Sequence, residues 1–203
     1  MTTPTILIAT PTRGRSMDIE YCVGMMTSAS KHHAAWMPMG GQSDIYVARN
    51  SLINNFWHKK EHTTLVFIDS DIGFTQENFR DLIETPYPFV GGLYCDKGDN
   101  KKPVVVADGI DTVADLPDAT IPVKYLPMGF TKIHRSVLEA LVEKKLVPAY
   151  GPEDQRQYQF FNGAIENDYL LSEDFSFCYL ARQAGITPMA NCKIRVKHDG
   201  RSL

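Results

Sequence analysis

The stretch Leu65-Val66-Phe67-Ile68-Asp69-Ser70-Asp71 decides the fold class of this sequence. Its first four residues form a continuous apolar run of strand-forming types, which is typical of a strand buried on both faces of a parallel sheet. Two carboxylates follow the run directly, at the point where open α/β sheets bind their ligands. The stretch therefore predicts an α/β protein with a polar site at the carboxyl ends of its strands.

Helices and strands alternate on the amino-terminal side of this stretch. Residues 6–9 predict a first strand that runs into a turn, and residues 16–31 predict a helix. Apolar residues recur at helical spacing from Ser43, which predicts a second helix. The polar residues of this second helix are expected on the surface, and they include Arg49, Asn50, Asn54 and Lys60.

The second half of the chain predicts shorter elements, and two helix starts are marked by capping residues. The expected elements are a helix from Thr75 through Glu84, a strand over 88–92, a strand over 104–106, two strands within 121–133, a helix over 136–146, a helix capped by Ser172 and ended by Gly185, and a strand over 192–198 whose even-numbered residues share one face. This order predicts an α/β sandwich with a mainly parallel central sheet and a mixed C-terminal edge.

The composition bounds the class of protein. The chain has 203 residues, 43% of them hydrophobic, which suffices for one core and not for two comfortable domains, so a single domain over residues 1–203 is expected. A net charge of -3 gives no global basic field that would attract nucleic acid. The four cysteines follow no zinc spacing and are expected as free thiols. Neither a signal peptide nor a membrane-spanning run is recognisable, so a cytoplasmic location is expected.

Asp69 and Asp71 are the first candidate site residues. Two carboxylates at the end of a buried strand can share a divalent cation, and hard oxygen ligands suit Mg²⁺ or Mn²⁺, which commonly bind a phosphate as well. Two turn aspartates that accept hydrogen bonds from nearby amides would give the same residue types. Both interpretations stay open on the sequence alone.

The start of the helix after Ser172 and the end of the last strand hold further candidates. Glu173 or Asp174 could act as a general base toward an acceptor hydroxyl, although capping and the helix dipole explain the same residue types. A neutral His198 could complete a metal site begun by Asp71, and a surface histidine is the alternative.

The turn after the first strand and one helix residue are candidates for nucleotide binding. The turn reads Thr10-Pro11-Thr12-Arg13, at the strand end where an open α/β sheet meets a nucleotide. Arg13 or Arg49 could pair with a diphosphate. A solvated helix residue is the alternative for Arg49.

Together these segments resemble the GT-A fold glycosyltransferases, in particular their large inverting branch, over most of the chain. The matching motifs are Thr10-Pro11, Ala48-Arg49-Asn50, the D-x-D motif Asp69-Ser70-Asp71, Gly129-Phe130, Ile133-His134-Arg135, Glu173-Asp174 with the helix that follows, Gly185 and His198. The resemblance implies a GT-A-like, Rossmann-like sandwich with a nucleotide-binding part over about 1–95 and an acceptor-binding part over about 96–203. Such a compact chain is similar to viral and bacterial versions of the family.

The resemblance also implies an activity and roles for individual residues. It implies a hexosyltransferase that uses Mn²⁺ or Mg²⁺ and a nucleotide sugar, with UDP-sugar as the expected donor, and that inverts the anomeric centre. Asp174 would be the base with Glu173 beside it, and Asp71 the main metal ligand. Further metal ligands would be Asp69 and His198. The donor would be bound by Thr10, Pro11, Thr12, Arg13, Arg49, Asp69 and Ser70, and its sugar by the segment 91–94, which includes Gly92 and Tyr94.

Several alternatives remain open from the sequence. The acceptor could be a glycan, a lipid-linked glycan, a protein hydroxyl or a hydroxylated DNA base. Asp69 also resembles the nucleophile of haloacid-dehalogenase-type phosphatases, and a nucleotidyltransferase could use a similar sheet and metal. Besides these three enzyme classes (glycosyltransferase, phosphatase and nucleotidyltransferase), a sugar-binding or nucleotide-binding module without enzymatic activity is the remaining alternative. A viral protein of this kind would act in the host cytoplasm.

Overall fold

The computed structural model describes residues 5–14, 16–96 and 102–199. The amino-terminal elements are β1 (Ile6–Pro11), α1 (Ile19–Ser28), β2 (Ala35–Met39), α2 (Ile45–His58), β3 (Thr64–Ile68), β4 (Ile72–Gly73), α3 (Gln76–Glu84) and β5 (Phe89–Leu93). The carboxyl-terminal elements are β6 (Thr120–Pro122), β7 (Phe130–His134), α4 (Arg135–Glu143), β8 (Ala149–Tyr150), β9 (Gln157–Tyr158), β10 (Ile165–Glu166), β11 (Tyr169–Leu170), α5 (Glu173–Gln183), β12 (Met189–Arg195) and β13 (Lys197–His198).

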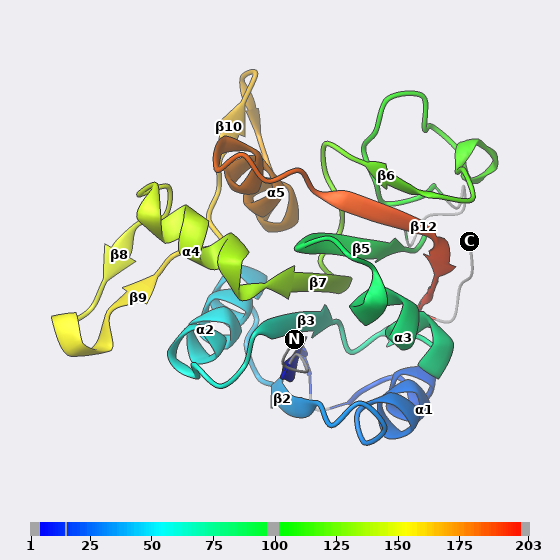
Figure 1. Cartoon of the computed structure of the whole chain (residues 1–203), viewed down its shortest axis with the longest axis horizontal. Helices are drawn as coiled ribbons and strands as arrows, with labels where there is room; N and C mark the ends of the chain where they lie inside the picture. Colours follow the sequence, from blue (N-terminus) through cyan, green and yellow to red (C-terminus); the bar gives the residue numbers. More distant parts are fainter. Residues whose placement is uncertain (1–4, 15, 97–101, 200–203) are drawn as a thin grey trace.

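A seven-stranded mixed sheet runs through the molecule in the order β2-β1-β3-β7-β5-β12-β6 (Figure 1). Strands β2, β1 and β3 are parallel to one another, and β5 is parallel to β12. The predicted α/β class and largely parallel sheet are therefore confirmed, together with the antiparallel edge strand β6. In addition, β7 runs antiparallel between β3 and β5 in the middle of the sheet. The residues of β7 carry no local signal of strand direction, which is set by the path of the chain between β6 and α4.

Helices cover both faces of the sheet. Leu7, Leu65 and Phe67 point to one face and pack in one core with α2, α4 and α5. Ile8 and Val66, which alternate with them, point to the other face and pack with α1 and α3. Figure 1 shows the same two layers, with α1 and α3 together on one side. Each fully buried Leu or Ile of these strands contributes about 1.5–3 kcal/mol relative to exposure, so the sheet carries much of the core.

Several local predictions are confirmed. Thr75 caps α3 with a reciprocal hydrogen-bonded box, Ser172 caps α5, and Gly185 follows α5 with a positive φ of 82°. The even-numbered residues of β12 are buried and the odd-numbered Lys193 and Arg195 are exposed, as the alternation predicts. The four cysteines are free thiols.

Other local predictions are wrong. Residues 104–106 form no strand, and only isolated bridges connect this region to the rest. Strand β2 was not predicted, because its exposed, proline-containing sequence lacks the pattern of a half-buried strand and is tolerated only at a sheet edge. Three polar residues of α2 are buried instead of exposed, and they are Arg49, Asn50 and Asn54.

The sheet brings the candidate site residues to one edge. Strands β1 and β3 are parallel neighbours, so the turn after Pro11 and the motif after Ile68 leave the sheet on the same side. The Asp69 amide donates a 2.9 Å hydrogen bond to the carbonyl oxygen of Gly129, which joins this motif to the start of β7. Within the described part of the chain, no helix is both long and apolar enough to cross a membrane.

Candidate active site

Arg49 of α2 lies at the centre of a cluster of carboxylates. Its two terminal nitrogens each donate a 3.0 Å hydrogen bond to one oxygen of Asp69. Its Nε lies 3.4 Å from Asp174 Oδ1 and 3.6 Å from Glu173 Oε1. The side chain is only 2% exposed. One buried guanidinium therefore joins the motif after β3 to the start of α5.

The charges in this cluster do not balance, because three carboxylates face one arginine. Burial lowers the pKa of Arg49, but the charges of Asp69 and Asp174 outweigh it and the net pKa is raised, so the guanidinium stays protonated. Burial raises the pKa of the Asp174 carboxyl well above its usual range, against the opposing effect of Arg49. A further cation or a proton is thus favoured beside these residues.

Asp174 has one occupied oxygen and one unsatisfied oxygen. Its Oδ2 accepts a 3.0 Å hydrogen bond from the Met128 amide. Its Oδ1 is buried and, among the described residues, has no hydrogen-bond partner, as is also true of Arg49 Nε. Arg49 Nε faces Oδ1 at 3.4 Å as an ion pair without a hydrogen bond, so Oδ1 keeps lone pairs that can accept a hydrogen bond from a bound molecule.

Asp71 and His198 form a second pair beside this cluster. His198 Nε2 lies 3.6 Å from Asp71 Oδ2, because β13 pairs with β4 and places His198 opposite Ile72. His198 Nδ1 lies 3.0 Å from the carbonyl oxygen of Cys95. A carbonyl only accepts hydrogen bonds, so Nδ1 carries the proton and Nε2 of a neutral ring is the nitrogen that can coordinate a cation.

A pocket of about 270 Å³ opens over the D-x-D motif. The sequence-predicted residues that line it are Pro11, Thr12, Arg13, Asp69, Ser70 and Asp71. It is also lined by residues that the sequence analysis did not assign to the site, namely Gln42, Ser43, Ile45 and Ala48. The turn after β1, the start of α2 and the loop after β3 therefore meet around one cavity, because β1 and β3 are parallel neighbours.

Other predicted donor-binding residues lie away from the lining of this pocket. Thr10 is fully buried and its hydroxyl contacts Tyr21 Oη at 2.6 Å. Gly92 is buried against Phe130 and Ile194, where a Cβ atom would meet Ile194 at 2.6 Å. Arg49 reaches the pocket only through Asp69, whose oxygens it binds. Thr10, Gly92 and Arg49 are therefore core residues and do not line the donor pocket.

Tyr94 and Gly129 pack against each other and against Asp69 of the D-x-D motif. The Gly129 amide donates a 3.1 Å hydrogen bond to Tyr94 Oη, and the Tyr94 ring packs edge-on against His198 with centroids 4.9 Å apart. A Cβ atom on Gly129 would lie 2.5 Å from Tyr94 Oη and 3.1 Å from Asp69 Oδ2. Only glycine allows this close approach of the tyrosine, the carboxylate and the backbone.

The residues present fit a divalent cation in part. Asp71 and His198 offer an oxygen and a nitrogen side by side, a combination that suits Mn²⁺. No group of three or more His, Cys, Asp and Glu side chains that could hold a metal occurs in the part of the chain that the structure describes. A cation here would therefore take further ligands from water or from a bound phosphate, as Mg²⁺ and Mn²⁺ commonly do.

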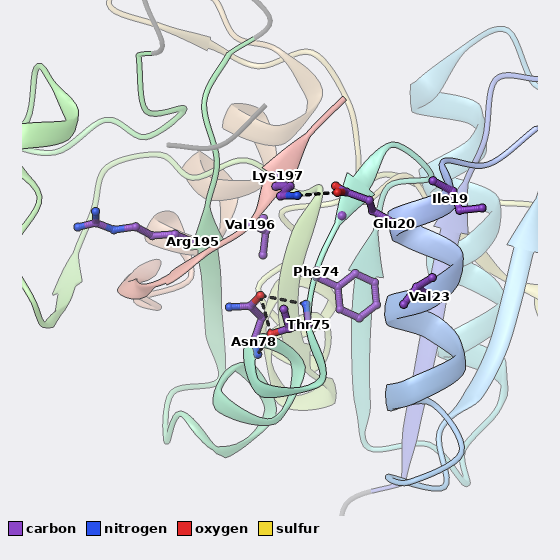
Figure 2. Close-up of a pocket in the computed structure, with 10 residues that line it drawn as sticks. Ile19, Glu20, Val23, Phe74, Thr75, Asn78, Arg195, Val196 and Lys197 are labelled. Carbon is purple, nitrogen blue, oxygen red and sulfur yellow. Dashed lines mark hydrogen bonds and ion pairs between the residues drawn. The ribbon is translucent and has the colours of Figure 1, made fainter. Parts of the chain in front are cut away.

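A separate, largely apolar pocket of about 420 Å³ lies between α1 and the segments 73–78 and 195–197 (Figure 2). Figure 2 shows Lys197 and Glu20 pointing toward each other across it, at 2.5 Å, with Val23 and Phe74 below them. The α1 helix approaches β4 closely, since a Cβ atom on Gly24 would lie 2.6 Å from the Phe74 carbonyl oxygen. The hydrogen bond from the Asp18 amide to Ser70 O joins the start of α1 to the D-x-D loop, and the close contact of Gly24 with Phe74 packs α1 against the segment that follows this loop.

Two groups of the site had no signal in the sequence. The Met128 amide binds Asp174, and the Cys95 carbonyl orients His198. Both are backbone groups, which every residue type carries, so only the path of the chain reveals them.

Comparison with known proteins adds evidence on the fold. No family profile matches the chain, and no curated protein matches it. Among solved structures, A197 from STIV matches over 96% of this chain and 85% of its own, with a TM-score of 0.60 and 17% identity. At this identity the match shows a shared fold. The chain thus shares its α/β fold with A197.

Two weaker matches have TM-scores below the level at which they bear on the fold. A glycosyltransferase involved in glycosylation of the major capsid of PBCV-1 has a TM-score of 0.38 and 14% identity, over 70% of this chain and 65% of its own. The 4-diphosphocytidyl-2C-methyl-D-erythritol synthase from Anaerococcus prevotii has a TM-score of 0.42 and 11% identity, over 76% of this chain and 82% of its own.

Proposed function

We propose that the chain is a metal-dependent glycosyltransferase that moves a sugar from a nucleoside-diphosphate sugar, with UDP as the expected nucleotide, to an acceptor hydroxyl with inversion. One observation carries the proposal. Arg49 binds Asp69 and faces Asp174, so the motif of the donor pocket and a carboxylate with an unsatisfied oxygen lie within one cluster. A donor pocket beside a base is what transfer to a hydroxyl requires.

Asp174 is the residue proposed to take the proton of the acceptor hydroxyl. Its Oδ1 is the unsatisfied oxygen, and the hydrogen bond from Met128 to Oδ2 fixes the direction of the carboxylate. Burial raises its pKa, which makes it a stronger base than an exposed aspartate. Arg49 is a positioning residue that holds Asp69, Glu173 and Asp174 in register.

Asp71 and His198 are the residues proposed to hold Mn²⁺ or Mg²⁺. Their atoms lie side by side at 3.6 Å beside the pocket, and the Cys95 carbonyl sets the tautomer of His198. When bound, the ion supplies positive charge that stabilises a departing nucleoside diphosphate. Thr12, Arg13 and Ser70 line the pocket in which the nucleotide would lie. Arg13 can offer its guanidinium to a phosphate.

Nucleotide binding with and without metal tests the proposal. UDP at a hundred-fold excess over its Kd should stabilise the protein by about 3 kcal/mol in the presence of Mn²⁺ and by much less in its absence. Asp71→Ala should remove the Mn²⁺-dependent part. Asp118→Ala is the matched control, because Asp118 is 88% exposed and pairs with Lys193 at 3.7 Å on the surface.

The result also separates the other enzyme classes. A glycosyltransferase should release UDP from UDP-glucose in the presence of Mn²⁺ and should leave a generic phosphate ester intact. Turnover of the ester, or turnover of a nucleoside triphosphate with release of pyrophosphate, would indicate a phosphatase or a nucleotidyltransferase. Absence of Mn²⁺-dependent binding for every nucleotide would contradict the proposal.

A further inference from the structure

A second cavity, of about 600 Å³, lies beside the first turns of α2, and we infer that it binds the acceptor as a neutral oligosaccharide. The inference rests on the proposed function, because an acceptor has a meaning only for a transferase. The polar and aromatic residues that line the cavity are Asp44, Tyr46, Asn50, Ser51, Tyr150, Gln159 and Asn162.

Helix α2 separates this acceptor cavity from the donor pocket. Ile45 and Ala48 line the donor pocket, whereas Tyr46 and Asn50 line the acceptor cavity. Arg49 lies between these residues in the sequence and contacts the carboxylates of both Asp69 and Asp174. The two cavities therefore lie on two sides of the same helix turn, and Arg49 on that turn contacts the carboxylates.

The carboxylates of the catalytic cluster also lie close to the acceptor cavity. Burial raises the pKa of the Tyr46 hydroxyl, and the negative charges of Glu173, Asp44 and Asp174 raise it further. The field of these carboxylates therefore reaches Tyr46, which lines the acceptor cavity on the adjoining side of α2.

Two buried asparagines of α2 fix the chain segment that carries the lining residues Gln159 and Asn162. The Asn50 amide donates to Phe161 O at 2.6 Å and accepts from Phe161 N at 3.0 Å. Asn54, one turn later, makes the same pair of bonds with the Tyr158 backbone, both at 2.8 Å. These four hydrogen bonds hold residues 158–161 against α2, in the way that backbone hydrogen bonds hold a neighbouring strand. The cavity is therefore preformed, which lowers the entropic cost of binding.

The chemistry of the lining favours a carbohydrate. Tyr46 and Tyr150 offer ring faces for the apolar faces of sugar rings, with hydroxyls for hydrogen bonds. Gln159 and Asn162 can donate and accept together, as a sugar hydroxyl requires. Among the lining residues that the structure describes, none is Lys or Arg, and Asp44 is acidic. A nucleic acid or a lipid phosphate needs cationic partners, so both are disfavoured here.

Binding to an array of neutral oligosaccharides tests the inference, with a DNA duplex and a polyprenyl phosphate in detergent as competing probes. At least one oligosaccharide should bind, and Tyr150→Ala and Asn162→Ala should each weaken it about tenfold. Tyr150 is 46% exposed, so its removal leaves the core intact. The matched control is Tyr87→Ala, because Tyr87 is 39% exposed, lies outside this cavity and should not affect affinity.

The outcomes separate this inference from the proposed function. Mn²⁺-dependent UDP binding without oligosaccharide binding, or with DNA or polyprenyl phosphate bound instead, overturns the acceptor assignment and leaves the donor site standing. Oligosaccharide binding that Tyr150→Ala and Asn162→Ala leave unchanged places the sugar elsewhere and overturns it too. Oligosaccharide binding without any nucleotide binding overturns both proposals and indicates a carbohydrate-binding module.

Discussion

Arg49 and Asp69 form a bidentate pair, with both hydrogen bonds at 3.0 Å, although they belong to a helix and to the loop after a strand. The same guanidinium lies over the Phe67 ring, 5.3 Å from its centroid. The pair fixes the position of the D-x-D motif relative to α5, because Arg49 Nε also faces Asp174. Three predictions test how this cluster and its neighbour Gly129 contribute to stability and activity, and a fourth concerns the separate ion pairs of Glu166.

Removing the guanidinium should destabilise the fold strongly. In Arg49→Met the carboxylates of Asp69 and Asp174 lose their buried partner, and breaking a buried ion pair from one side costs about 3–5 kcal/mol. Arg49→Lys should cost less, since it keeps the charge but loses the two-pronged geometry. Urea unfolding measures both free energies. The control Arg80→Met, which breaks exposed ion pairs with Glu77 and Asp81, should cost far less because water screens those pairs, and an equal loss there would refute the prediction.

Asp174→Asn should separate activity from stability. Transfer should fall about 10²–10⁴-fold, as is typical for loss of a general base, while Asn retains an oxygen for the Met128 amide. Because the folded-state pKa of Asp174 is raised, the ionised carboxylate opposes folding as pH rises above the ordinary pKa of an aspartate. The stability of Asp174→Asn relative to wild type should therefore increase with pH above about 4. Turnover with UDP-glucose and thermal unfolding at several pH values measure the two effects; full activity in Asp174→Asn would exclude it as the base.

Gly129→Ala should disturb the motif through steric contact. The added Cβ atom would lie 2.5 Å from Tyr94 Oη, and such overpacking costs about 1–3 kcal/mol. UDP affinity in Mn²⁺ should fall as well, because Asp69 lies 3.1 Å from the same position. Tyr94→Phe removes the hydroxyl that collides, so the double variant should recover part of the lost stability in a double-mutant cycle. Gly14→Ala, whose Cβ atom would meet no atom of the described residues outside its chain neighbours closer than 3.9 Å, is the control for stability.

Glu166 should make a stability contribution that depends on pH. Hydrogen bonds from Lys124 and then Tyr125, with Arg182 on its other oxygen, lower the pKa of Glu166 to about 2. A lowered carboxyl pKa stabilises the fold above the unfolded-state value and loses that effect as pH falls. The destabilisation caused by Glu166→Gln should thus be constant near neutral pH and shrink between about pH 4.5 and pH 2. Denaturant melts across this range measure the difference, and a gap that does not change with pH would contradict the assignment.

The sequence predicted the elements whose signals are local. The apolar run before Asp69, the cap at Thr75 and the glycine after α5 each act within a few residues, so their patterns can be recognised without neighbours. The α/β class follows from the same local patterns. The meeting of Thr12, Arg13 and Asp71 at one pocket was predicted as well, because parallel strands end at the same edge.

What only the tertiary structure decided concerns groups that are far apart in the chain. The direction of β7, the burial of Arg49 and of Asn54, the orientation of His198 by the Cys95 carbonyl and the existence of two cavities around α2 depend on long-range contacts. A polar residue on a helix has the same local pattern whether water or a buried carboxylate faces it. Its partner is supplied by another part of the chain, and only folding brings the two together.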